Sequence, residues 1–218
     1  MTQRHITRNA PKAQGFIPTP EDQRVSEAIA KAEATTSGEI VAVVASESDS
    51  YLYAPFLCAA LASLVAAWPL IYFTWLSVQW IYVIQLLLFA TLSAVLALRP
   101  LRYRLVPRSV LVERAHARAV EQFLAQNLHT TIGRTGVLIF VSVAERYAEI
   151  LADAGIHQKV PEGTWQVIVD EMTAEIGEGR TTDGFVKAVE QVGKHLARHF
   201  PPGSVPAHTL ANHLIVLN

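Results

Sequence analysis

Two hydrophobic patterns alternate along the chain and predict an α/β fold. Apolar residues at spacings of three and four predict amphipathic helices near 19–37, 108–127, 163–179 and 181–200. Two short continuous apolar runs, 40–45 and 137–143, are rich in β-branched residues and predict buried strands. Each run is too short to fold alone. We therefore expect them to be neighbours in one short central sheet that is flanked by the helices.

A third pattern separates the two strands. Residues 50–98 contain no Asp, Glu, Lys or Arg over 49 positions, whereas about 20 apolar residues suffice to cross a bilayer. The block therefore predicts a two-helix transmembrane hairpin, with spans near 53–72 and 78–98. Trp68, Trp75 and Trp80 cluster near the expected turn, as in an interfacial aromatic belt. The alternative is a pair of very hydrophobic core helices in a soluble protein.

Composition separates this block from the rest of the chain. The 218 residues have a mean hydropathy of +0.27, but all 18 basic and 19 acidic side chains lie outside residues 50–98. That leaves about 22% charged residues in the remaining 169, close to the roughly 25% of soluble domains. The sequence is thus an ordinary soluble domain with a hydrophobic insertion. The net charge of −1 gives no reason to expect nucleic acid as a partner.

The domain organisation follows from these boundaries. We expect no signal peptide, because no apolar segment precedes residue 40. The predicted segments are a disordered N-terminal tail at 1–18, the first part of the α/β domain at 19–49, the transmembrane helical hairpin at 50–98, the second part of the domain at 99–200, and a C-terminal tail at 201–218.

Charge beside the hairpin predicts its orientation. Six arginines follow the second span within 20 residues, against one acidic residue, Glu113. Because basic flanks favour the cytoplasmic side, we expect an integral protein of a bacterial inner membrane with both soluble parts in the cytoplasm. Arg99, Arg102, Arg104 and Arg108 are also candidates for binding anionic lipid headgroups. The plainer interpretation is that they only fix the topology.

Three segments carry a family resemblance: "GEIVAVVA", "TGVLIFVSVAERYAEILADAGIHQKVPEGTWQVIVDEM" and "GEGRTTDGFVKAVEQVGKHLARHF". In their order and spacing they resemble the TPM domain family, and in particular a subset of membrane proteins. It covers roughly residues 20–49 and 105–200, and implies a hydrophobic strand, an "ER" turn, a second strand and a Trp-containing helix. Many members have a downstream anchor, whereas here the anchor follows the first strand. Phosphatase activity, calcium binding and assembly roles have been attached to different members.

Three carboxylates, Glu145, Glu149 and Asp153, recur every fourth residue and are the candidate catalytic groups. In a helix they would stack about 6 Å apart on one face. In a strand about 13 Å would separate neighbours, which is too far to chelate one ion. The resemblance implies the strand. A metal site, for a divalent cation such as calcium, would then need Asp153 with His157 or Asp170. The alternative is a solvated face.

Other candidate sites are weaker. Arg146 could bind an anion such as phosphate, although a local ion pair with Glu145 that closes a turn is the favoured interpretation. His195 and His199 have the spacing of metal ligands on a helix but lack the glutamate of a zinc protease motif. Phosphate-binding, dinucleotide-binding and nucleophile-elbow motifs are absent, and the single cysteine excludes a paired-cysteine zinc site.

Two functions remain open from the sequence. The first is a non-enzymatic, membrane-tethered module that binds a partner protein or helps to assemble a membrane protein complex. The alternative is a phosphate-ester hydrolase that uses the three carboxylates and a divalent metal. The expected partners are the lipid bilayer and a membrane protein complex. The sequence identifies neither a small-molecule substrate nor a cofactor beyond that cation.

Overall fold

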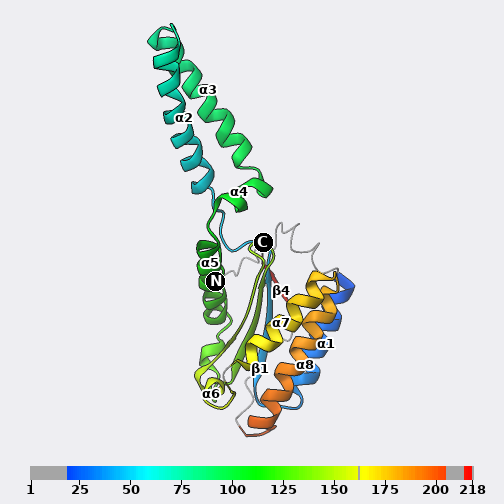
Figure 1. Cartoon of the computed structure of the whole chain (residues 1–218). Helices are drawn as coiled ribbons and strands as arrows, with labels where there is room; N and C mark the ends of the chain where they lie inside the picture. The colour runs from blue at the N-terminus through cyan, green and yellow to red at the C-terminus, as the bar shows by residue number, and fades with distance from the viewer. Residues whose placement is uncertain (1–18, 162, 205–213, 218) are drawn as a thin grey trace, which may run out of the picture. The chain divides into compact units, whose positions relative to one another are not determined.

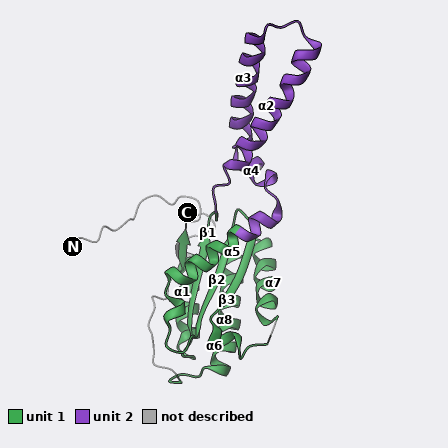
Figure 2. Ribbon diagram, turned by 90° about the vertical axis from the view of Figure 1, so that its left-hand side faces the viewer, with its two compact units in different colours: residues 1–48, 114–218 green, residues 49–113 purple. Residues whose placement is uncertain are grey.

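A computed structural model describes residues 19–161, 163–204 and 214–217. The chain divides into two compact units, Met1–Ser48 with Arg114–Asn218, and Asp49–Glu113 (Figure 2). The second unit therefore extends 15 residues beyond the hairpin boundary expected at residue 98. The expected N-terminal tail, 1–18, lies outside the described residues.

A four-stranded sheet forms the centre of the first unit. Its strand order is β3-β2-β1-β4. The strands are β1 (Glu39–Ala45), β2 (Gly136–Ser142), β3 (Tyr147–Ala152) and β4 (Ile215–Leu217). β1 and β2 are parallel, and every residue of both is buried. This confirms the expected pairing of the two apolar runs across the insertion.

Helices cover both faces of this sheet (Figure 1). α5 (Arg108–Ala125) packs on one face. The other face is covered by α1 (Thr19–Glu33), α7 (Thr164–Gly177) and α8 (Thr181–His199). Alternate strand residues supply the two cores, because successive side chains of a strand point to opposite faces. Each fully buried aliphatic or aromatic side chain contributes roughly 1.5–3 kcal/mol to folding.

Two edges of the sheet complete the first unit. β3 pairs antiparallel with β2 through a short turn, as the resemblance implied. β4 pairs in parallel with β1, from Val43 opposite Ile215 to Ala45 opposite Leu217. The C-terminal residues 201–218 were expected to be a tail, so β4 is a difference from the prediction. Its three apolar residues gain burial and backbone hydrogen bonds on the otherwise unpaired edge of β1. Residues 205–213 and 218 lie outside the described part.

The second unit is dominated by two apolar helices, α2 (Tyr53–Phe73) and α3 (Val78–Leu96), which pack against each other. Their bounds agree closely with the predicted spans. Both are long and apolar enough to cross a membrane, with mean hydropathies of 2.0 and 1.8. Only 11% and 6% of the two apolar windows are buried. Core helices of a soluble protein would instead be mostly buried.

A small core stabilises the other end of the second unit. It contains Tyr51, Ala54, Val106 and Leu111, with short helix α4 (Arg99–Leu105) beside it. The rings of Tyr51 and Tyr103 meet edge to face at 5.6 Å. Ring contacts of this kind add about 0.5–1.5 kcal/mol beyond simple burial. The aromatic residues therefore order the chain where it enters and leaves the hairpin.

Candidate functional site

Glu145 lies buried in the turn between β2 and β3. Its side chain is 1% exposed, and its Oε1 accepts a hydrogen bond from the backbone N–H of Ser48 at 2.8 Å. Its other oxygen accepts a hydrogen bond from the Ser142 hydroxyl. The hydroxyls of Ser48 and Ser142 are also 2.8 Å apart. Glu145 thus joins the segments that follow β1 and β2, at the carboxyl ends of two parallel strands.

Glu149 has different partners on the face that α5 covers. The Tyr147 hydroxyl donates a hydrogen bond to its Oε2 at 2.9 Å. His116 Nδ1, on α5, lies 2.9 Å from the same oxygen. The sequence did not suggest His116, since it lies 33 residues away within an ordinary polar stripe of a helix. This group is a half-exposed His–Glu–Tyr cluster, and it contains neither Glu145 nor Asp153.

Asp153 begins the short helix α6 (Ala154–His157). Its Oδ1 accepts a hydrogen bond from the Ala154 N–H at 2.7 Å, and Arg134 Nη1 lies 3.9 Å from that oxygen. Carboxylates at this position satisfy the free N–H groups of a first helical turn. The role that the structure gives Asp153 is therefore that of a helix cap.

The three carboxylates do not converge. Residues 147–152 form a strand, as the resemblance implied. Only Glu149 lies in that strand, whereas Glu145 is in the turn before it and Asp153 caps α6 after it. Of the metal candidates, His157 is exposed on α6, while the exposed Asp170 accepts a hydrogen bond from Gln166 at 2.8 Å. Within the described residues, no three His, Cys, Asp or Glu side chains are grouped to hold a metal ion.

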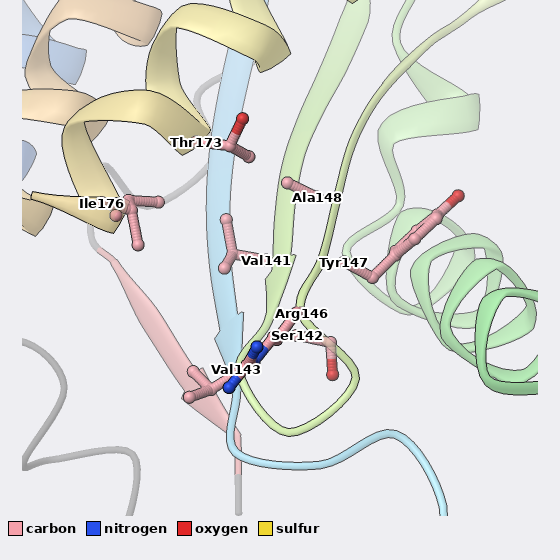
Figure 3. Close-up of a pocket in the computed structure, with 9 residues that line it drawn as sticks. Val141, Ser142, Val143, Arg146, Tyr147, Ala148, Thr173 and Ile176 are labelled. Atoms are coloured by element: carbon pink, nitrogen blue, oxygen red, sulfur yellow. The ribbon is translucent and has the colours of Figure 1, made fainter. Parts of the chain in front are cut away.

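Arg146 borders a cavity of about 450 Å³ beside the same turn. Its backbone is left-handed, with φ 49°. The walls are mostly apolar and come from β2, the start of β3 and the last turns of α7 (Figure 3). The lining residues include Val141, Val143, Ala148 and Ile176. In Figure 3 the Tyr147 ring points away from Thr173 and Ile176, so the cavity is on the α7 side of the sheet.

A second hollow of about 310 Å³ continues along β3. It is lined by residues 147–150 of the strand and by Trp165, Gln166 and Val169 of α7. The two hollows share Tyr147 and Ala148. Together they form a groove between β3 and α7, which we call the β3–α7 groove. Sequence periodicity could not reveal it, because it depends on how α7 packs beside the strand.

The remaining candidates have individual environments. Arg102 is buried, with its guanidinium 5.1 Å from the Tyr103 ring centre, whereas Arg104 and Arg108 are exposed. The side chain of Arg99 lies outside the described part. His195 meets Trp165 edge to face at 6.1 Å. Burial, then the charges of His199 and Arg198, lower the pKa of His195 below its ordinary value of 6.5.

Comparison with known proteins agrees with this architecture. The structure is similar to the NMR structure of BA42 protein from the psychrophilic bacterium Bizionia argentinensis, with a TM-score of 0.56 and 19% identity over 92% of this chain and 95% of that one. At this identity the likeness concerns the fold alone. No curated protein matches the chain. Residues 108–195 match the family model described as the TPM domain. The chain therefore carries a domain of the TPM family.

Proposed function

We propose that this chain is a membrane-anchored protein whose TPM domain is a non-enzymatic binding or assembly module for a partner protein. The observation that carries the proposal is the apolar surface of α2 and α3, which the described residues leave almost wholly exposed. Trp68, Trp75 and Trp80 are all exposed on it. An exposed apolar surface of this length is unfavourable in water. In lipid it is favourable, because the backbone N–H and C=O groups of each helix are hydrogen-bonded within the helix.

The flanking charge supports a defined orientation for the anchor. The exposed Arg104 and Arg108 follow α3 and belong to a basic stretch with one acidic residue, Glu113. A hairpin returns the chain to its starting side, so both soluble segments share one compartment. We place them in the cytoplasm, beneath a bacterial inner membrane.

The geometry of the acidic residues favours binding over hydrolysis. Glu145 holds two strand ends together, Glu149 contacts a histidine, and Asp153 caps a helix. None of these contacts brings a nucleophile, a base and an anion-binding group to one point, which hydrolysis of a phosphate ester requires. The larger cavity of the β3–α7 groove is instead mostly apolar, as ligand-binding pockets commonly are.

Membrane insertion and orientation can be tested with single cysteines. In a Cys58→Ser background, a cysteine is introduced at the exposed Ser77, before α3, or at the exposed Ser109, in the basic flank. We expect a membrane-impermeant maleimide to label intact cells at position 77 and to label position 109 only after lysis. The reverse result would overturn the orientation, and release of the chain by alkaline carbonate would overturn the anchor.

Binding can be tested by crosslinking within the membrane. A photo-crosslinking amino acid is placed at Thr173, which lines the groove, or at the exposed Glu190 of α8 as a matched control. We expect a reproducible crosslinked protein at position 173 that is absent at position 190. Identical patterns at both positions would contradict a binding role for the groove.

A phosphatase assay tests the alternative function, hydrolysis of phosphate esters. We expect the purified chain, Glu149→Ala and Asp153→Ala to hydrolyse a generic phosphate ester at the same background rate, with or without added calcium or magnesium. A rate that rises with either cation and falls at least about tenfold in a variant, as for loss of a catalytic group, would favour the hydrolase.

A further inference from the structure

Gln85 places a polar amide inside the second apolar helix, α3. The helix begins at Val78, so about 10 Å of helix precede Gln85 at 1.5 Å per residue. When α3 crosses a hydrocarbon layer about 30 Å thick, this residue therefore lies near the middle of the layer. Long Lys and Arg side chains can extend to the headgroups from inside a membrane, whereas glutamine is too short to do so from this depth.

The hairpin does not supply a hydrogen-bond partner for this amide. Within the described residues, the structure gives the Gln85 side chain no hydrogen bond. α2 and α3 lie side by side (Figure 1), and counting back from their connection sets Ala66 and Ala67 at the level of Gln85. Their methyl groups offer neither a donor nor an acceptor. Because Gln85 is only partly buried, part of its surface faces the surroundings of the hairpin.

The other polar side chains of the hairpin have different environments. The Ser63 hydroxyl donates to the Ala60 carbonyl at 2.9 Å, and hydroxyls are commonly satisfied within their own helix in this way. The Ser93 hydroxyl is enclosed within the hairpin. Gln79 is exposed in the first turn of α3, close to the aromatic residues that mark the headgroup region. Gln85 differs because an amide with two donors and an acceptor lies at the depth of the lipid tails.

We propose that two copies of the hairpin associate side by side in the membrane, with their Gln85 amides hydrogen-bonded to each other. An amide is self-complementary, since the N–H group of each copy can donate to the C=O group of the other. In a symmetric pair about an axis along the membrane normal, equivalent residues lie at the same depth. A helix of another protein would instead need its own polar group at that level. The inference rests on the membrane anchor proposed above and identifies a second copy of this chain as the partner of that anchor.

Energy transfer between labelled copies tests this association in a bilayer. In the Cys58→Ser background, a single cysteine replaces the exposed Ser109 and carries a donor or an acceptor dye. Both forms of the full chain are reconstituted together in phosphatidylcholine liposomes. We expect energy transfer that falls when more lipid or unlabelled chain is added. A carbonate-resistant chain without transfer above that of random proximity would overturn this inference alone, in favour of a helix from another protein. Release of the chain by carbonate would remove the anchor on which it rests.

Matched glutamine variants test the role of the amide. We expect Gln85→Leu to weaken association about tenfold, as for loss of hydrogen bonds between membrane helices. Gln79→Leu, in the first turn of the same helix, should leave association unchanged. Leucine favours insertion, so weaker association cannot result from a weaker anchor. Equal effects of the two substitutions, or no effect of Gln85→Leu, would overturn the proposal.

Mixed pairs test whether the two amides contact each other. If they do, one substitution already removes the reciprocal hydrogen bonds. A wild-type donor copy should then bind a Gln85→Leu acceptor copy no more tightly than two Gln85→Leu copies bind each other. If each Gln85 contacted some other group, the two losses would add, and the mixed pair would lie midway between the two symmetric pairs. Additive losses would therefore overturn the proposed contact.

Discussion

Replacing Glu145 by alanine should destabilise the first unit strongly. The side chain is almost fully buried and accepts hydrogen bonds from the Ser48 N–H and the Ser142 hydroxyl. Hydrogen bonds to a charged group contribute about 1.5–3 kcal/mol each, and an abandoned buried donor adds its own cost. Since the Ser142 hydroxyl can still contact Ser48 at 2.8 Å, we expect a net loss of about 2–4 kcal/mol.

The loss can be measured as a melting temperature. For a chain of this size, 1 kcal/mol shifts the midpoint by roughly 2–4 °C, so Glu145→Ala should melt about 5–15 °C lower. Trp165 reports on the first unit, provided that the hairpin tryptophans Trp68, Trp75 and Trp80 are replaced by phenylalanine. The hairpin itself then contributes no tryptophan fluorescence to the transition.

Two matched variants test whether the hydrogen bonds of Glu145 cause the loss of stability. Glutamine at position 145 keeps an acceptor for the Ser48 N–H and offers a donor to Ser142, so Glu145→Gln should cost only about 1 kcal/mol. Glu149→Ala removes a side chain whose partner His116 is half-exposed, and it should also cost about 1 kcal/mol or less. If the melting temperature of Glu145→Ala equals that of the wild type, or is no lower than that of Glu149→Ala, the structural role assigned to Glu145 is wrong.

Three further outcomes follow from the packing and the charges. Gly155→Ala should cost about 1–3 kcal/mol, because its Cβ would lie 2.5 Å from the Gly133 carbonyl oxygen, whereas Gly177→Ala meets nothing within 4 Å and should melt no lower than wild type. The pKa of His195 is lowered by burial, so the folded unit resists its protonation. The free energy of unfolding should therefore be highest above pH 6.5 and should fall as the pH drops below it. Denaturant midpoints measured against pH should change less for His195→Gln than for the wild type. Leu64→Arg, on the exposed face of α2, should reduce the carbonate-resistant fraction, since a central arginine costs about 2.5–3.5 kcal/mol on insertion.

Much of the fold could be predicted because its elements carry local signals. The apolar runs that became β1 and β2 are buried at every position, and such strands read as continuous hydrophobic segments. The helical hairpin is signalled by length and by the absence of charge alone. For residues 147–152, however, the local pattern favours a helix. These residues form a strand because pairing with β2 outweighs their local helix propensity. Only the family resemblance predicted that strand.

The side-chain contacts could not be predicted in the same way. His116 and Glu149 are in contact because α5 packs on the face of the sheet to which Glu149 points. Neither local sequence indicates that contact. The burial of Glu145 has the same cause, since its partner Ser48 is 97 residues away. The short β4 was missed because a strand of three apolar residues carries too little pattern to be identified.

The position of the insertion explains why Glu145 is needed where it lies. The chain leaves the first unit after Ser48 and returns at Arg114, so β1 and β2 are joined through 90 residues instead of a short crossover. A long connection constrains the strand ends weakly, although its entropic cost grows only slowly with length. A buried carboxylate from the β2–β3 turn that accepts the Ser48 N–H fixes the last residue of the unit before the chain departs. That contact holds the residues after β1 beside the turn that follows β2. Glu145 therefore belongs to the architecture of an interrupted domain.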